Sequence, residues 1–451
     1  ESVLNAHGLT RTLGEIDVCR NADGQPLYYT GNSSIVFRLH SEKGDRMLKC
    51  YTRPHRNLEK IYGARLRPSE LFLYTSSSEG VWTDVVVDEW IEGESLSNVF
   101  HRAVADRDRT LLGKTAEAFD LLAARLLPAA WAHGDLKPDN LIWNGSELRM
   151  IDFDAVFLPE FHGQQSPELG TKAFQHPSRT RNDFNASLDD YPAALIATAL
   201  HAAACDPSLA ARYADTDGML LDPAEILAGQ SSAYDGILDL FARCGDAIGY
   251  RTAQLLASPT LRIPQAATLF AWRIRPLRKP AETPELDVAD GRWGFRIGSR
   301  FVIPPVWDNG FDFSEEVAAV ALGGRWHFID TAGCVVLNCP PCDAVKPFRN
   351  GVAELLRRVR ELHSLRAAAM SMNMAYSKAW TVLRTAQEGL GVKLLRSSTG
   401  GRNGGGATLT AEGERLLAAY EDYCAKLTAY GETLFAETFA FYDTLTEEKP
   451  E

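Results

Sequence analysis

The spacing of apolar residues changes along the chain and divides it into successive regions. Up to about residue 98, short apolar runs such as IVFRLH, RMLKCYT and WTDVVVDEW alternate with Gly, Asp, Pro and Ser, which predicts β-strands. From about 105 to 275, apolar residues recur every three or four positions, as in KTAEAFDLLAARLL and YPAALIATALHAAA, which predicts helices. This order indicates an α+β fold with two lobes, and we predict a first domain over residues 1–275.

The pattern changes again beyond this domain. Residues 276–290 are rich in proline and charge, which predicts a linker. Residues 291–353 hold an imperfect tandem repeat with Gly and Pro turns, which predicts small β-hairpin units. Residues 354–430 predict helix, helix, glycine-rich hairpin and helix, and residues 431–451 form an acidic tail.

Composition narrows the function only slightly. A chain of 451 residues, with 45% apolar and 24% charged residues, is ordinary for globular protein and too long for one core. The net charge of -12 argues against nucleic-acid binding along the whole length, although one domain could carry a basic patch. No apolar run reaches the length of a membrane span and no secretory signal is evident, so we expect a cytoplasmic protein without a membrane partner.

The eight cysteines are scattered, which favours a reducing compartment over a disulfide framework. Cys339 and Cys342 form a CxxC pair without the second pair that zinc sites usually need, so the pattern disfavours zinc.

The octapeptide HGDLKPDN, residues 133–140, contains the groups that phosphate transfer requires. Moving a γ-phosphate depends mainly on positioning and on neutralising charge. Asp135 is the candidate base, and Lys137 can reach the transferring phosphate. Asn140 and the later Asp152 offer the hard oxygen ligands that suit Mg²⁺.

Residues nearer the N-terminus could complete a nucleotide site. Lys49 lies in the strand-like run RMLKCYT, where it could pair with phosphates, and Glu59 in the next helix could pair with Lys49. Backbone N–H groups around Gly31, Asn32 and Ser33 could cradle phosphate.

These motifs resemble the protein kinase family. HGDLKPDN matches the catalytic-loop pattern His-x-Asp-Leu-Lys-Pro-x-Asn at every defined position, and IDFD matches the metal-binding Asp-Phe-Gly motif at two of three. GTKAFQHPS looks like the end of an activation segment, and Asp190 resembles the aspartate that buttresses the catalytic loop. The resemblance covers about residues 15 to 275 and implies ATP and Mg²⁺ as cofactors. Leu-Lys-Pro is similar to serine/threonine kinases, which implies hydroxyl groups of a protein substrate as acceptors. The hinge-like run VVVDEWIEGESL implies adenine contacts from the backbone near Glu89 and Trp90.

Three positions depart from that family. Gly31 is the one glycine left in the phosphate loop. Gly134 stands where an arginine usually pairs with an activation-loop phosphate, which implies activity without loop phosphorylation. Asp154 replaces the glycine of Asp-Phe-Gly, which predicts a less permissive backbone there. His133 is expected to be structural, its ring bonding the backbone near the metal loop. These departures leave open a pseudokinase scaffold that binds partners without transferring phosphate.

The repeats look like WG repeats, because one unit keeps the Trp-Gly pair at Trp293 and Gly294. That resemblance implies a spacer or a surface for a protein partner, and their aromatic residues fit a core better than a ligand site.

The last region resembles the winged-helix DNA-binding domain of molybdate-responsive transcription regulators. SLRAAAMSMNMAYSKAWTVL looks like the helix-turn-helix, and TGGRNGGGA looks like the wing. The alternatives are a helical dimerisation module and a transcription regulator in which the kinase-like domain acts as a sensor. The resemblance implies double-stranded DNA as a partner, contacted by residues of the second helix and the wing: Ser377, Lys378, Arg384, Arg402 and Asn403.

Overall fold

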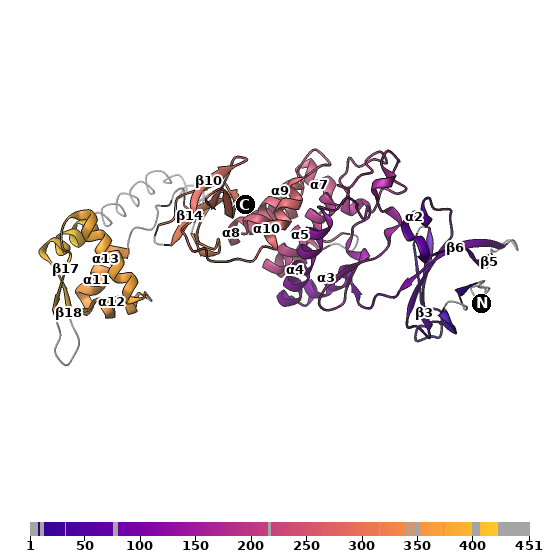
Figure 1. Cartoon of the computed structure of the whole chain (residues 1–451), viewed down its shortest axis with the longest axis horizontal. Helices are drawn as coiled ribbons and strands as arrows, with labels where there is room; N and C mark the ends of the chain where they lie inside the picture. The colour runs from indigo at the N-terminus through magenta and orange to yellow at the C-terminus, as the bar shows by residue number, and fades with distance from the viewer. Residues whose placement is uncertain are drawn as a thin grey trace, which may run out of the picture. The chain divides into compact units, whose positions relative to one another are not determined.

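The computed structural model divides the chain into two compact units (Figure 1). The first comprises residues 1–310 and 320–343, and the second comprises residues 311–319 and 344–451. The structure describes residues 8–9, 13–31, 33–74, 80–214, 218–314, 316–339, 341–342, 345, 351–372, 374–398 and 406–422.

The first unit begins with an antiparallel six-stranded sheet. Its strands are β1 (Ile16–Val18), β2 (Tyr28–Thr30), β3 (Ser34–Ser41), β4 (Arg46–Tyr51), β5 (Leu66–Tyr74) and β6 (Gly80–Glu89). The order is β1-β3-β4-β6-β5, with β2 paired to β3. Alternating apolar positions such as Leu39, Leu48 and Val85 form the core of one face. The strands predicted at IVFRLH, RMLKCYT and WTDVVVDEW are therefore confirmed as β3, β4 and β6. The short helix α2 (Leu58–Tyr62) and the 3-10 turn η2 (Gly63–Arg65) lie between β4 and β5.

A helical part follows, as predicted. In it, α4, α5, α9 and α10 pack side by side (Figure 1). Most residues of α5 are buried, which explains why the sequence of this helix is almost wholly apolar. The helices are α3 (Leu96–Ala105), α4 (Arg109–Leu126), α5 (Asp190–Cys205), α6 (Pro207–Tyr213), α7 (Pro223–Ala228), α8 (Ser232–Cys244), α9 (Ala247–Leu255) and α10 (Gln265–Arg273).

The loops that carry the candidate site are anchored by a small sheet in this part. Its order is β7-β8-β9, and the strands are β7 (Glu94–Ser95), β8 (Leu141–Trp143) and β9 (Leu148–Met150). Short 3-10 turns interrupt the connecting segments: η3 (Pro138–Asn140), η4 (Phe153–Ala155), η5 (Pro159–Phe161) and η6 (Lys172–Phe174).

Two further sheets follow α10. The first contains β10 (Glu285–Ala289), β11 (Arg292–Ile297) and β12 (Arg300–Trp307), and the second contains β13 (Asn309–Gly310), β14 (Val317–Leu322), β15 (Arg325–Asp330) and β16 (Val335–Asn338). Strand β10 lies inside residues 276–290, the range predicted as a linker. This segment forms a strand because its residues pair with β11 along their full length.

Ion pairs hold these strands against the helical part. The Arg251 guanidinium of α9 donates to the Val306 carbonyl at 2.7 Å and to the Asp308 carboxylate at 2.8 Å. Arg325 of β15 contacts Asp239 of α8 at 2.8 Å. Because the Arg251 side chain is largely buried, these contacts join β12 and the chain just after it firmly to α9.

The second unit contains α11 (Gly351–Leu362), α12 (Leu365–Ser371), α13 (Tyr376–Leu390), the hairpin β17 (Leu395–Ser398) and β18 (Gly406–Leu409), and a helix over residues 411–422. Its core includes Leu356, Leu383 and Leu417. The first predicted helix is in fact two helices. His363 has a φ of 51°, which ends α11, and the Ser364 hydroxyl caps α12. In the described part of the chain, no helix is long and apolar enough to cross a membrane.

Candidate active site and helix-turn-helix segment

The predicted catalytic residues of the octapeptide meet around one threonine. The Thr171 N–H donates to Asp135 Oδ1 at 2.6 Å. Lys137 Nζ donates to Thr171 Oγ1 at 3.0 Å and lies 3.5 Å from Asp135 Oδ2. The Asn140 amide donates to the Asp135 carbonyl at 2.9 Å. The structure therefore brings Asp135, Lys137 and Asn140 together, and the segment that contains GTKAFQHPS closes over the candidate base.

The backbone of this loop is held by a buried carboxylate. Asp189 accepts the N–H of His133 at 2.5 Å and the N–H of Gly134 at 3.0 Å. Burial raises the pKa of Asp189, although these two N–H donors oppose that rise. The prediction gave this role to Asp190, and that was wrong by one residue, because the carboxylate of Asp189 is the one that meets the loop. His133 Nε2 lies 2.8 Å from the Ile151 carbonyl, which confirms the structural role predicted for this ring.

Gly134 occupies a position that admits no side chain. Its φ is +82°, and a Cβ placed there would lie 2.1 Å from the Ala155 carbonyl oxygen. The arginine of the resembled family is therefore excluded here by contact with the segment after Asp152.

The segment predicted to bind metal lies beside Asn140. The Asn140 carbonyl accepts the Ile151 N–H at 2.9 Å, which fixes Asp152 next to the loop. The Asp152 side chain is 46% exposed, so its carboxylate is accessible to solvent. Its φ is 63°, so the unusual backbone conformation falls at Asp152, whereas Asp154 is not among the described residues with positive φ. The expected backbone difficulty at Asp154 was therefore wrong.

Lys49 is held by two carboxylates of this motif. Its Nζ lies 2.5 Å from Asp152 Oδ1 and 2.6 Å from Asp154 Oδ2. The second oxygen of Asp154 accepts the hydroxyls of Tyr51 at 2.8 Å and Tyr62 at 2.6 Å. Burial alone would lower the pKa of Lys49, but the charges of Asp152 and Asp154 raise it above its ordinary value. The pKa of Asp154 is lowered, because Lys49 and the two hydroxyls outweigh its burial.

The predicted pair between Lys49 and Glu59 is not brought together. Glu59 is exposed on α2, whereas Leu58 and Tyr62 are the residues of that helix that face inward. With only five residues, α2 presents one short buried face, and Tyr62 fills the place toward Lys49 and Asp154.

The predicted hinge residues Glu89 and Trp90 lie at the end of β6 and just after it. The Trp90 N–H donates to the Asp45 carbonyl at 3.2 Å, and the Glu89 N–H donates to the Asp88 side chain at 2.9 Å. Both N–H groups are therefore already bonded within the protein in this arrangement. The indole of Trp90 instead stacks on Tyr29, with ring centroids 6.1 Å apart.

The phosphate-loop residues are described only in part. The Gly31 N–H donates to the Ser34 carbonyl at 2.9 Å, and the Ser33 carbonyl accepts the Thr52 N–H at 2.9 Å. These bonds fix the turn between β2 and β3. Asn32 lies outside the described residues.

Besides Tyr62 and Asp189, the sequence interpretation missed three further residues of the site. Thr171 organises Asp135 and Lys137, and its position after a glycine in a loop was the available signal. Glu168, three residues earlier, has a pKa raised by burial and by the charge of Asp154. Tyr51 follows Lys49 by two positions, so the alternation of a strand places both side chains on the same face.

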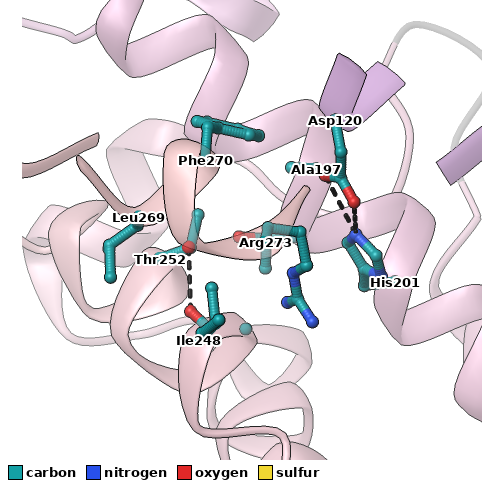
Figure 2. Close-up of a pocket in the computed structure, with 10 residues that line it drawn as sticks. Asp120, Ala197, His201, Ile248, Thr252, Leu269, Phe270 and Arg273 are labelled. Carbon is teal, nitrogen blue, oxygen red and sulfur yellow. Dashed lines mark hydrogen bonds and ion pairs between the residues drawn. The ribbon is translucent and has the colours of Figure 1, made fainter. Parts of the chain in front are cut away.

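A small cavity lies elsewhere, among α4, α5, α9 and α10 (Figure 2). His201 Nε2 lies 2.9 Å from Asp120 on its wall, and Arg273 binds Asp246, whose carboxylate caps α9. None of its lining residues belongs to the octapeptide, and these pairs join neighbouring helices.

In the second unit, α13 carries the residues predicted to contact DNA. Ser377 and Arg384 are exposed, and Lys378 is half-buried. Trp380, which the prediction omitted, is 52% exposed and shares the face of Ser377 and Arg384 through helical spacing. Arg402 and Asn403 lie outside the described residues.

Comparison with protein families identifies the two segments separately. Residues 88–158 match the phosphotransferase enzyme family. This segment contains the octapeptide and Asp152, so its predicted resemblance to phosphate-transferring enzymes is confirmed. Residues 353–414 match the bacterial regulatory helix-turn-helix protein family of LysR type. This match covers α11 to β18.

Two curated proteins are similar to the second segment. The transcriptional regulator ModE of Haemophilus influenzae is 37% identical over 67 residues, which cover 15% of this chain and 26% of that protein. The molybdenum-pterin-binding protein MopB of Rhodobacter capsulatus is 36% identical over 66 residues, which cover 15% of this chain and 24% of that protein. The chain thus spans about a quarter of the length of these relatives. The predicted resemblance to molybdate-responsive regulators is confirmed over this segment.

Proposed function

We propose that the first unit is an ATP- and Mg²⁺-dependent phosphotransferase that acts on serine or threonine hydroxyls of a protein. The observation that carries this proposal is the meeting of Asp135, Lys137 and Asn140 beside a metal motif whose Asp152 contacts Lys49. These groups supply the base, the phosphate contacts and the metal ligands that phosphoryl transfer needs.

Each residue has a role that its surroundings support. Asp135 orients the acceptor hydroxyl and takes its proton, and Lys137 stabilises negative charge on the transferring phosphate. The amide of Asn140 donates through its nitrogen, which leaves its oxygen for a cation, and the half-exposed carboxylate of Asp152 is a second hard ligand. Bound Mg²⁺ would neutralise phosphate charge between these two residues. Lys49, on strand β4 of the six-stranded sheet, pairs with the phosphates.

Phosphate transfer is tested by the variant Asp135→Asn, which keeps the shape of the side chain and removes its basicity. Loss of a general base lowers the rate on the order of 100-fold. The measurement is transfer from labelled ATP to protein acceptors, including this chain, mapped by mass spectrometry.

The matched control is Asp139→Asn, which changes an exposed aspartate of the same loop and should leave transfer unchanged. If wild type and Asp135→Asn label acceptors equally, the proposal is wrong. Under the scaffold alternative, Mg·ATP would also fail to stabilise the protein, whereas occupancy at 100 times Kd adds about 2.7 kcal/mol.

We also propose that the second unit binds double-stranded DNA through α13. The match to a regulatory helix-turn-helix family favours this function, and so does the exposed face that contains Ser377, Trp380 and Arg384. Such a helix enters the major groove, where Arg reads base edges or binds phosphates. We further propose that the β-sheets at 285–338 act as a spacer of WG-repeat type between the two activities, in a cytoplasmic protein.

The DNA proposal predicts a specific effect of Arg384→Ala. Affinity should fall about tenfold, because one direct contact is lost, and the slope of log K against log salt should decrease by about one if that contact is to a phosphate. Gel shifts with a pool of random duplexes at several salt concentrations measure both quantities.

Arg415→Ala is the matched control, because it removes the same charge from the exposed surface of the helix at 411–422. Its effect should be clearly smaller. Equal effects of the two variants would indicate non-specific attraction, and no shift at any salt concentration would refute DNA binding.

A further inference from the structure

We propose that Asp154 is the residue that positions Lys49, in place of a carboxylate from the helix after β4. This inference rests on the proposed function, because it assigns Lys49 to the phosphates. In kinases that use a lysine on this strand, a glutamate from the neighbouring helix holds it, and movement of that helix controls activity. Here the holding carboxylate belongs to the metal loop itself.

Both oxygens of Asp154 accept hydrogen bonds from inside the protein. One oxygen contacts Lys49 at 2.6 Å, and the other accepts from Tyr51 at 2.8 Å and Tyr62 at 2.6 Å. The Asp154 side chain is 7% exposed and that of Lys49 is 5% exposed. A buried ammonium needs a permanent counter-charge, and a carboxylate fixed by two hydroxyls provides one with a defined direction.

Asp152 and Asp154 differ in exposure and in hydrogen bonding, and these differences give them different roles. Asp152 is 46% exposed and accepts one hydrogen bond from Lys49 at 2.5 Å, so its carboxylate is accessible to a cation from solvent. Asp154 is enclosed and both of its oxygens already accept hydrogen bonds from the protein, so Asp152 is better placed than Asp154 to meet a metal ion. When Asp152 turns to another partner, Asp154 still holds Lys49.

The helix after β4, α2, contributes a hydroxyl group and no charge to the site. Its five residues, Leu58–Tyr62, place Glu59 outside and Tyr62 inside. Tyr62 donates its hydroxyl to Asp154, so the helix supports the pair and supplies no charge to it. Burial and the neighbouring charge of Asp154 raise the pKa of Tyr62, which keeps it a donor. The position of Lys49 therefore depends on the metal loop more than on this helix.

The test compares Asp154→Asn with Glu59→Gln in the full chain. Both substitutions neutralise one acid without changing its shape. The first readout requires no enzymatic activity: labelling of Lys49 by an N-hydroxysuccinimide ester at one fixed pH, quantified on its peptide by mass spectrometry. Asp154→Asn should raise the labelling rate about tenfold, which corresponds to losing one hydrogen bond to a charged group. Glu59→Gln should leave it unchanged.

The second readout is phosphate transfer from Mg·ATP. Asp154→Asn should lower kcat/KM about tenfold with most of the change in KM for ATP, because Lys49 loses its direction toward the phosphates. Glu59→Gln should behave as wild type. If wild-type transfer is absent, the proposed function fails, and the labelling comparison still decides the role of Asp154.

Two outcomes overturn the inference: Asp154→Asn leaves both readouts unchanged, or Glu59→Gln changes them as much. Should Asp154→Asn fail to fold, Tyr62→Phe answers the same question, because it removes one hydrogen bond from Asp154 and keeps its charge. Its Lys49 labelling should rise less than tenfold but measurably, and an unchanged rate would refute the arrangement.

Discussion

Gly134→Ala is expected to destabilise the first unit by about 2–5 kcal/mol and to abolish phosphate transfer. A non-glycine residue at positive φ costs roughly 1–2 kcal/mol, and forcing an atom into a packed site costs roughly 1–3 kcal/mol more. Here φ is +82°, and the added Cβ would lie 2.1 Å from the Ala155 carbonyl oxygen. Since that oxygen is backbone, the segment Asp152 to Ala155 must move, and the metal motif moves with it. Thermal unfolding and transfer from labelled ATP measure the two effects.

Gly145→Ala separates backbone strain from the steric clash. Gly145 has a φ of +100° in the turn between β8 and β9, and no other residue lies within 4 Å of the added Cβ. Its cost should be only the roughly 1–2 kcal/mol of positive φ, and transfer should persist. If the two variants lose similar amounts of stability and transfer activity, positive φ alone explains why a glycine is needed at position 134. The loss of the family's arginine at this position would then have no steric cause.

The octapeptide could be predicted from the sequence because its chemistry is local. Asp135, Lys137 and Asn140 lie within six positions, so a single loop carries their relative geometry, and the structure brings them together. The strands and helices of the first domain were predictable for a similar reason, because period-two and period-3.6 patterns report which face is buried. Strand β10 was missed, since proline and charge around it hid its alternation, and its partner β11 is what stabilises it.

The contacts that were mispredicted join elements far apart in the sequence. Whether Lys49 meets Glu59 or Asp154 depends on the length and rotation of α2, which no local pattern encodes. The choice between Asp189 and Asp190 depends on the start of α5, where a shift of one residue turns a side chain by about 100°. Helix ends are the least certain part of any sequence interpretation, and here a single position decides which acid holds the catalytic loop.

Asp189→Asn is expected to destabilise the first unit by about 3 kcal/mol and to lower phosphate transfer on the order of 100-fold. The carboxylate accepts the N–H groups of His133 and Gly134 at 2.5 and 3.0 Å in a fully buried place. An amide offers only one acceptor oxygen, so one buried N–H is left facing another N–H. The loop that carries Asp135 then shifts, and a displacement of about 1 Å can cost a factor of 100. Chemical denaturation and transfer assays check both effects.

Asp190→Asn should stabilise the folded protein, whereas Asp189→Asn destabilises it, and the effect of Asp190→Asn should depend on pH. Burial and the charge of Asp189 raise the pKa of Asp190 to about 7. When folding raises the pKa of an acid, the folded protein loses stability as the pH rises from the unfolded pKa of about 3.9 toward the folded pKa of about 7. Above pH 7 the full loss of stability remains. Removing the charge should therefore stabilise the protein at pH 8, on the order of 2 kcal/mol, and change little at pH 4.5. Asp189→Asn should be destabilising at pH 8, where the contrast is largest. If the two variants respond alike at pH 8, then Asp189 does not hold the loop by itself, and the buttress is shared by both acids at the start of α5.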